Sequence, residues 1–189
     1  KNIKKSPFRL VTSARSDVPL KGLDYLLEAF SKVVQIFPES TLEVIGSSKK
    51  GGHTTRKIKD LSIKDKVHFN KDLSFKEVRD LYCSSDIVVI PSLYEGFGFA
   101  IGEAMACRAP VITTSGGAIP EVIGNCGITV APGNSKELEE AMLKLLPDEN
   151  LKNSLAEKGF NRIIEQLQWK EAAKLMTESY EAEIKRMTE

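Results

Sequence analysis

Short apolar runs rich in β-branched residues alternate along the chain with longer segments in which apolar residues recur at helical spacing. The short runs predict six β-strands: Phe8–Thr12, Thr41–Ile45, Val67–Phe69, Ile87–Ile90, Val111–Thr113 and Ile128–Val130. The segment Gly22–Phe37 places its leucines, Phe30 and two valines on one stripe, which predicts an amphipathic helix. Capping-type spacing at Ser74–Glu77 and Asn134–Glu137 predicts the starts of two further helices.

This order of elements predicts an α/β fold with a doubly wound, mainly parallel sheet and flanking helices. Strands separated by helix-length segments are joined by right-handed crossovers, which makes neighbouring strands parallel. The unbroken apolar run Ile87–Ile90 is typical of a strand buried on both faces. We expect a single domain over residues 1–189, with the sheet in about 8–147 and charged helices in about 148–187. Such sheets bind ligands outside the carboxyl ends of their strands.

Composition and charge narrow the class of protein. The chain has 189 residues, 41% hydrophobic and 28% charged, which suits one soluble domain with a full core. Lys+Arg (27) and Asp+Glu (26) nearly cancel, so the charge gives no support to a nucleic-acid partner. Three widely spaced cysteines without a CxxC pair predict neither a disulfide framework nor a zinc site, and favour a reducing compartment.

The length of the apolar runs and the composition of the N-terminal segment indicate where the protein is located in the cell. No apolar run approaches the roughly 18 residues of a membrane helix, so we expect no transmembrane segment. The lysine-rich start is followed by no apolar stretch that could act as a signal peptide, which favours a cytoplasmic location. The missing initiator Met and the early first strand predict that the chain is a piece of a longer protein.

The stretch from Pro91 to Met105 carries the most informative chemistry. It follows a buried strand directly, and Gly96 and Gly98 let the backbone approach a ligand closely. A helix beginning near Phe99 would point free N–H groups and the positive end of its dipole at a phosphate. Glu95 in the loop and Glu103, expected in the first helical turn, are carboxylates that accept hydrogen bonds from sugar or ribose hydroxyls.

Two further loops follow predicted strands at the same edge of the sheet. After the first strand, Arg15 can grip two phosphate oxygens with its planar fork, and Lys21 adds a positive charge at a helix start. After the fifth strand, Gly116 and Gly117 offer either backbone donors to a ligand or only a tight turn. We expect these loops to converge with the loop that carries Glu95.

Together these motifs resemble the family-4 retaining glycosyltransferases. The resemblance rests on Arg15 with Lys21-Gly22, on Glu95-Gly-Phe-Gly followed by Glu103, and on Gly116-Gly117-Ala-Ile-Pro-Glu, and it covers about Phe8 to Asn134. In that family two Rossmann-like domains face each other in the GT-B arrangement. This chain resembles only the C-terminal, donor-binding domain, so the resemblance implies an N-terminal acceptor-binding domain as partner.

The resemblance also implies a role for each matching residue. Arg15 and Lys21 would bind the diphosphate of a nucleoside-diphosphate sugar, Glu95 the transferred sugar and Glu103 the ribose hydroxyls. The backbone of Gly96, Phe97 and Gly98 would lie near the sugar and the phosphate. The base would sit against Phe69, Asn70 and Leu73. Attachment of the whole enzyme to a membrane through its missing domain would be peripheral.

Several residues depart from the family pattern. Ala14 stands where the family usually has a glycine, Ser47 and Ser48 follow Gly46 without the usual second glycine, and Asn70-Lys71 replaces a commonly glycine-containing turn. No Asp-x-Asp occurs, which removes the acidic metal clamp of the other main glycosyltransferase fold. Positive charge from Arg15, Lys21 and a helix end therefore predicts donor binding without a metal cofactor.

The remaining polar and sulfur residues are interpreted as structural. His68 lies in a short strand, and His53 in a polar segment where we expect it to be solvated. Cys83 and Cys107 lie on helices beside apolar residues, which predicts buried packing. Ser92 lacks the Gly-x-Ser-x-Gly setting of a hydrolase nucleophile. Phe97 and Phe99 can either pack the loop down or touch the ligand.

The sequence therefore predicts donor binding for retaining sugar transfer, with GDP-mannose as the first hypothesis ahead of UDP-glucose. Two other functions stay open: one half of a sugar-nucleotide epimerase, and a non-catalytic nucleotide-binding module. The epimerase would need acid–base side chains, and the module would bind free nucleotide as tightly as nucleotide sugar. An NAD-binding domain fits poorly because no GxGxxG follows the first strand.

Overall fold

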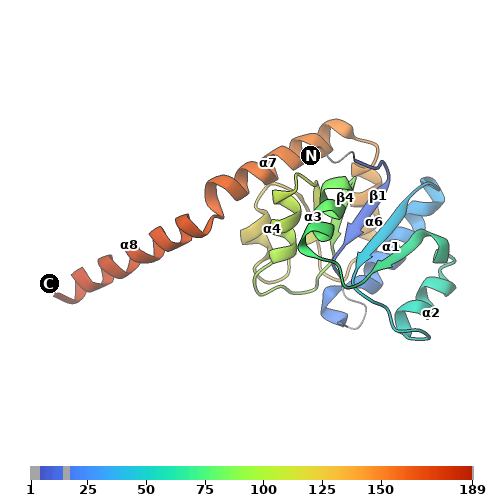
Figure 1. Cartoon of the computed structure of the whole chain (residues 1–189), viewed down its shortest axis with the longest axis horizontal. Helices are drawn as coiled ribbons and strands as arrows, with labels where there is room; N and C mark the ends of the chain where they lie inside the picture. The colour runs from blue at the N-terminus through green and yellow to red at the C-terminus, as the bar shows by residue number, and fades with distance from the viewer. Residues whose placement is uncertain (1–4, 15–17, 189) are drawn as a thin grey trace.

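The computed structural model describes residues 5–14 and 18–188, which form a layered α/β domain with one long helix projecting from it (Figure 1). The strands are β1 (Arg9–Thr12), β2 (Thr41–Ile45), β3 (Val67–Asn70), β4 (Ile87–Ile90), β5 (Val111–Thr114) and β6 (Ile128–Val130). The helices are α1 (Leu23–Ile36), α2 (His53–Asp60), α3 (Phe75–Ser84), α4 (Phe99–Ala106), α5 (Ile119–Ile123), α6 (Ser135–Leu145), α7 (Glu149–Gln166) and α8 (Trp169–Thr188), with short 3-10 helices at Pro19–Lys21 and Lys64–Lys66.

The six described strands form one parallel sheet in the order β3-β2-β1-β4-β5-β6. The chain moves outward from β1 to β3, then returns past β1 and continues from β4 to β6. The direction of winding therefore reverses between β1 and β4, which places the ligand-binding crevice of this fold at their carboxyl ends. The predicted doubly wound sheet is confirmed, and every predicted strand lies within one or two residues of its observed bounds.

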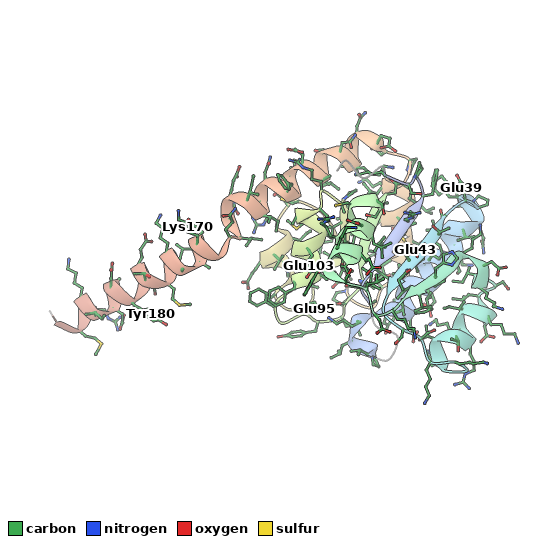
Figure 2. The ribbon with its side chains drawn as sticks, viewed as in Figure 1. Glu39, Glu43, Glu95, Glu103, Lys170 and Tyr180 are labelled. Carbon is green, nitrogen blue, oxygen red and sulfur yellow. The ribbon has the colours of Figure 1, made fainter. Side chains whose placement is uncertain are left out.

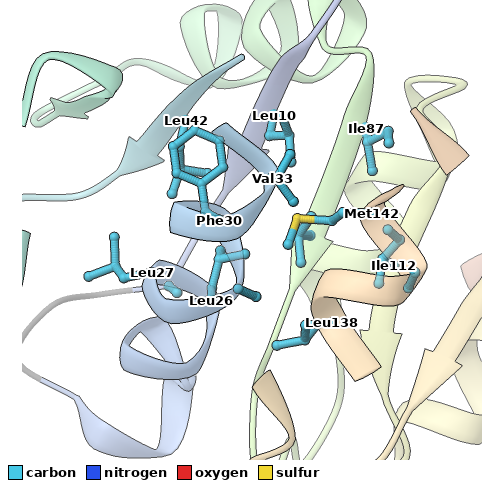
Figure 3. Packing of buried hydrophobic residues seen from close by; sticks show 14 of the residues in the cluster. Leu10, Leu26, Leu27, Phe30, Val33, Leu42, Ile87, Ile112, Leu138 and Met142 are labelled. Carbon is cyan, nitrogen blue, oxygen red and sulfur yellow. The ribbon is translucent and has the colours of Figure 1, made fainter. Parts of the chain in front are cut away.

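Alternate residues along the strands pack into two separate hydrophobic clusters, one on each face of the sheet. Leu10 and Leu42 pack with α1 and α6, where Phe30 and Met142 are fully buried (Figure 3). The intervening strand residues, such as Val11, pack with α3, α4 and α5 on the opposite face. Two covered faces explain why the central strand β4 is apolar throughout, as its burial at all four positions shows.

Local capping signals account for the starts of two helices. Ser74 and Glu77 form the predicted capping box at the start of α3, with the Ser74 side chain accepting from the Glu77 N–H. The Asn134 side chain accepts from the Glu137 N–H and caps α6. Helix α2 was not predicted, because its polar sequence buries only Thr54 and Ile58.

Helix α7 is fastened to the amino ends of β1 and β4 by a buried ion pair. Lys152 Nζ lies 2.7 Å from Asp86 Oδ1, and the two side chains are 3% and 7% exposed. The same ammonium donates to the Leu146 carbonyl at 3.0 Å and lies 2.7 Å from Glu149 Oε1. The second oxygen of Asp86 accepts from the Phe8 N–H at 2.9 Å. Each charged atom in this cluster therefore has a partner, as burial requires.

Helix α8 leaves the body of the domain, and Lys170 and Tyr180 mark its course (Figure 2). Five of its large apolar side chains are exposed: Leu175, Met176, Tyr180, Ile184 and Met187. Among the described residues, no helix combines the length and the apolar character that a membrane span requires.

Candidate functional site

The loop that follows β1 is held tightly against the loop that follows β4. Gly22 adopts φ +69°, and a Cβ built there would lie 1.9 Å from the Pro91 carbonyl oxygen. The Leu93 N–H donates to the Leu20 carbonyl at 2.8 Å, which joins the two loops a second time. Arg15, the first predicted phosphate ligand, lies outside the described residues. Lys21, the second, sits directly before this close contact.

This contact brings Lys21 and Glu95 together, although 74 residues separate them. Lys21 Nζ donates to Glu95 Oε1 at 2.7 Å, and the Ser92 hydroxyl donates to the same oxygen at 2.7 Å. The Glu95 side chain is only 15% exposed. Within the described residues both contacts use Oε1, so Oε2 stays available to a hydroxyl donor. Sequence reasoning missed Ser92 as the partner of Glu95; its only signal was its place between the buried strand and the glutamate.

Gly116 and Gly117 pack against the backbone of this loop so closely that a side chain at either position would clash with it. A Cβ at Gly116 would lie 2.1 Å from the Leu93 carbonyl oxygen, and one at Gly117 would lie 2.3 Å from that of Glu95. The Ala118 N–H donates to the Glu95 carbonyl at 2.8 Å. The loop after β5 therefore fixes the backbone of Glu95. A direct role of these two glycines in donor binding stays a prediction.

The stretch after Glu95 turns sharply into α4. Gly98 is the N-cap with φ +79°, a conformation that favours glycine. Gly96 has a different setting, because a Cβ there would meet nothing within 4 Å. Packing within the described chain therefore does not require glycine at 96, whereas close approach of a ligand would. Phe97 and Phe99 stack on each other with their ring centroids 4.3 Å apart, and both stay exposed.

Glu103 lies on α4 but not in its first turn, so that prediction was wrong. The helix begins at Phe99, which makes Glu103 its fifth residue, and the first turn contains no acidic residue. Three residues, Gly96, Phe97 and the N-cap Gly98, lie between Glu95 and the start of the helix. Figure 2 shows Glu95 and Glu103 at successive positions along this segment. Along the chain, the three loop residues and the first turn of α4 therefore lie between the two glutamates.

The surroundings of the Glu103 carboxylate are partly apolar. It lines a groove of about 430 Å³ together with Phe97, Phe99 and the junction of α7 and α8. Partial burial raises the pKa of Glu103 above its ordinary value. Within the described residues its carboxylate has no hydrogen-bond or ion-pair partner, so both oxygens can accept from a ligand.

The residues predicted to hold a base lie farther along the sheet. Asn70 ends the edge strand β3, which β2 separates from β1. Its Nδ2 donates to Glu43 Oε2 at 2.7 Å, a partner that sequence reasoning missed. Phe69 packs against the core beneath the sheet, and Leu73 is half-buried in the turn that follows. In the sheet, β2 and β1 lie between β3 and β4, the strand that precedes the Glu95 loop.

Among the described residues, no group of three or more His, Cys, Asp or Glu side chains could hold a metal ion. His53 is 70% exposed, as expected of a solvated residue, and its Nε2 lies 2.7 Å from Asp24 Oδ2 at the start of α1. His68 is exposed on the edge strand. Among the described residues, neither histidine forms a hydrogen bond or ion pair with Lys21 or Glu95.

The close contact at Gly22 predicts a measurable cost for a single methyl group. Gly22→Ala should lower the free energy of unfolding by about 2–3 kcal/mol, because it adds a backbone clash to the strain of a positive φ. Gly51→Ala is the matched control, since Gly51 has φ +71° but open space around its Cβ position, and should cost only about 1 kcal/mol. Urea unfolding followed by circular dichroism measures both. Equal losses in the two variants would contradict a role for the Pro91 contact.

The sheet order and the charged pair at the carboxyl ends of β1 and β4 define the class of protein. The domain is a Rossmann-like α/β unit of the kind found in GT-B glycosyltransferases. The chain belongs to the family "Glycosyl transferases group 1", whose profile matches residues 7–148.

Individual relatives agree with this family. The chain is 34% identical over 182 residues to an MMP alpha-(1->4)-mannosyltransferase of Mycolicibacterium hassiacum, a match that covers 95% of this chain and 44% of the relative. A solved C-terminal domain of a glycosyl transferase group 1 family protein (LpcC) from Francisella tularensis superposes with a TM-score of 0.76 at 26% identity, covering 88% of this chain and 89% of that one.

A more distant likeness concerns the fold. Anabaena Alr3699/HepE, solved in complex with UDP-glucose, matches with a TM-score of 0.80 at 22% identity, covering 94% of this chain and 49% of that one. The chain thus spans less than half the length of the mannosyltransferase and of the Alr3699/HepE chain.

Proposed function

We propose that this chain binds a nucleoside-diphosphate sugar and that the sugar is transferred, with retention of configuration, to an acceptor held by an N-terminal domain. One observation carries the proposal: Lys21 and Glu95 meet at 2.7 Å at the carboxyl ends of β1 and β4, beside the start of α4. A positive charge for a diphosphate and a carboxylate for sugar hydroxyls are thereby placed in one crevice.

The contacts suggest which part of the donor each residue would bind. Lys21 has only one described acceptor, so its other ammonium hydrogens can donate to the diphosphate together with Arg15 and the free N–H groups of α4. Glu95 Oε2 would accept from a hydroxyl of the transferred sugar, with Gly96, Phe97 and Gly98 lying alongside. Glu103 would accept from the ribose hydroxyls, and Phe69, Asn70 and Leu73 would flank the base.

The ion pair also accounts for charge stabilisation during transfer. As the glycosidic bond breaks, negative charge builds on the diphosphate and positive charge on the sugar ring. Lys21 and Arg15 would stabilise the first, and the Glu95 carboxylate would stabilise the second. This arrangement supplies the charge that a metal ion supplies in other sites, so we expect no metal cofactor.

The identity of the donor and the second domain remain proposals. A mannosyltransferase among the relatives supports GDP-mannose as the first donor to test, while a UDP-glucose complex among the distant ones keeps UDP-glucose as the second. The match to a solved C-terminal domain supports an acceptor-binding domain on the N-terminal side. Family membership favours sugar transfer over the epimerase and over a non-catalytic module.

A donor screen tests the proposal. Melting temperature should rise with GDP-mannose or UDP-glucose, because a ligand that binds only the folded state stabilises it. Lys21→Ala should weaken binding of the active donor by about 1.5–3 kcal/mol, the scale of a charge-assisted contact, in calorimetric titration. Lys64→Ala, on the 3-10 helix before β3, is the matched control and should leave donor affinity unchanged.

The same titration tests the absence of a metal requirement. Donor binding should be unchanged by EDTA. A loss on chelation that Mg²⁺ restores would overturn the metal-independent site. If none of the nucleoside-diphosphate sugars binds to the folded chain, the donor-binding function itself is wrong.

A further inference from the structure

Ser92 lies in a buried hydrogen-bond network at the carboxyl end of β4. Its hydroxyl donates to Glu95 Oε1 at 2.7 Å, and the residue is only 1% exposed. Its carbonyl accepts from the hydroxyl of Thr114, which ends β5 and is fully buried. The N–H of the next residue, Leu93, donates to the Leu20 carbonyl in the loop after β1. The backbone at Ser92 is therefore fixed from both neighbouring strands, β5 and β1.

Lys21 and Ser92 hold the same oxygen of Glu95 in different ways. The Lys21 side chain is 33% exposed and reaches Glu95 on a flexible stem. In the proposed function its ammonium is shared between Glu95 and the diphosphate. The Ser92 hydroxyl has Glu95 as its only acceptor among the described residues, and burial keeps water from competing for that hydrogen bond. The serine therefore holds Glu95 wherever the charge of the lysine is used.

We propose that Ser92 is a positioning residue for recognition of the transferred sugar: its hydroxyl fixes the Glu95 carboxylate so that Oε2 faces a sugar hydroxyl. The inference rests on the proposed function, which assigns Glu95 to the sugar. In this role Ser92 acts through Glu95 and needs no contact with the donor. Without the hydroxyl, Oε1 is held by Lys21 alone, and the terminal torsion of the glutamate is broad. Ordering the carboxylate on binding then lowers affinity for the sugar.

The role predicts a loss that is confined to the sugar-bearing ligand. Ser92→Ala should weaken binding of GDP-mannose or UDP-glucose, whichever binds the chain, by about threefold to tenfold, the range of one hydrogen bond. Affinity for the matching free nucleoside diphosphate should change by less than about twofold, because that ligand does not use Glu95. Calorimetric titration of the 189-residue chain measures both affinities.

Two further variants separate the hydrogen bond from packing and from general loss of stability. Ser92→Cys keeps nearly the same size but has only a weak donor, so it should resemble Ser92→Ala. Ser85→Ala is the matched control at the other end of β4, where the fully buried Ser85 hydroxyl donates to the Tyr82 carbonyl at 2.7 Å. It removes the same chemical group and should leave both affinities unchanged. Wild-type affinity in Ser92→Cys would show that Ser92 acts by packing, which would overturn the proposal.

A double-mutant cycle tests whether Ser92 acts through Glu95. Adding Ser92→Ala to Glu95→Ala should not weaken binding of the nucleotide sugar any further, because the group that the hydroxyl positions is already gone. An undiminished loss in that background would overturn the positioning role, as would equal losses for Ser92→Ala with and without the sugar.

Failure of this inference can be told apart from failure of the proposed function. Wild-type affinity in Ser92→Ala, beside a clear loss of nucleotide-sugar affinity in Glu95→Ala, would overturn the role of Ser92 alone. Wild-type affinity in Glu95→Ala, or no binding of either nucleotide sugar by the wild-type chain, would overturn the proposed use of the site and the role of Ser92 with it.

Discussion

Replacing Asp86 by alanine is expected to lower the free energy of unfolding by about 3–5 kcal/mol, because it leaves the ammonium of Lys152 buried without its main partner. The Lys152 side chain is only 3% exposed, so water cannot replace the carboxylate cheaply. The substitution also removes the acceptor for the Phe8 N–H. Both losses fall at the amino ends of β1 and β4, where α7 is attached.

Glu149→Ala is the matched control for this prediction. Glu149 contacts the same ammonium at 2.7 Å, but its side chain is 75% exposed. Loss of an exposed partner should cost no more than about 1 kcal/mol. Asp86→Asn, which keeps an oxygen acceptor for the N–H of Phe8, should fall between the two. Urea denaturation compares all three, and an Asp86→Ala loss no greater than that of Glu149→Ala would show that burial does not decide the cost.

Measurements of donor binding can show whether the loss of stability in the Asp86 variants also affects the proposed donor site. Asp86 and Lys152 lie at the opposite ends of the strands from Lys21 and Glu95. Each folded variant should therefore bind the donor with wild-type affinity at a temperature where it remains folded. A selective loss of affinity in Asp86→Ala would contradict the division of the domain into an anchoring end and a binding end.

The sheet could be predicted because its signals are local. Each strand is a short apolar run, and the unbroken run Ile87–Ile90 already implies two covered faces. Capping residues such as Ser74 and Asn134 mark helix starts within a few positions. Helix α2 lacks both kinds of signal, since it is polar and begins after Gly51-Gly52 without a side-chain cap.

The site was predictable only in outline. Loops at the carboxyl ends of parallel strands must share one edge of the sheet, and this topology brings Lys21 near Glu95. Two other features depend on side-chain geometry at long range. Asp86 and Lys152 are 66 residues apart, and neither has a local pattern that announces a buried pair. The start of α4 near Phe99 was predicted, but Glu103 is the fifth residue of the helix and therefore lies just beyond the first turn, where it was expected.

Substitutions of Glu103 and Glu95 are expected to change the affinities for free nucleoside diphosphate and for the sugar-bearing donor in different ways. Glu103→Ala should weaken both ligands alike, by about 1–3 kcal/mol for a charged hydrogen-bonding partner of the ribose. Its carboxylate has no hydrogen-bond or ion-pair partner among the described residues, so its removal leaves no protein group unpaired. The loss therefore reports the contact with the ligand and not a rearrangement of the loop.

Glu95→Ala should behave differently, because Glu95 is already held by Lys21 and Ser92. Its removal frees the Lys21 ammonium, which can then bind the diphosphate as well as before. Affinity for free nucleoside diphosphate should stay within about 0.5 kcal/mol of wild type, while the nucleotide sugar loses about 1–3 kcal/mol. In the complete enzyme, turnover should fall more than donor affinity, since the carboxylate stabilises charge that develops only in the transition state.

Calorimetric titration of both ligands against both variants gives four affinities. Glu95→Gln serves as the control for shape, because it keeps an oxygen acceptor but removes the charge that holds Lys21. It should retain part of the sugar contact and lose turnover. Equal losses for Glu95→Ala with and without the sugar would show that Glu95 contacts the nucleotide. A Glu103→Ala loss confined to the nucleotide sugar would reverse the two assignments.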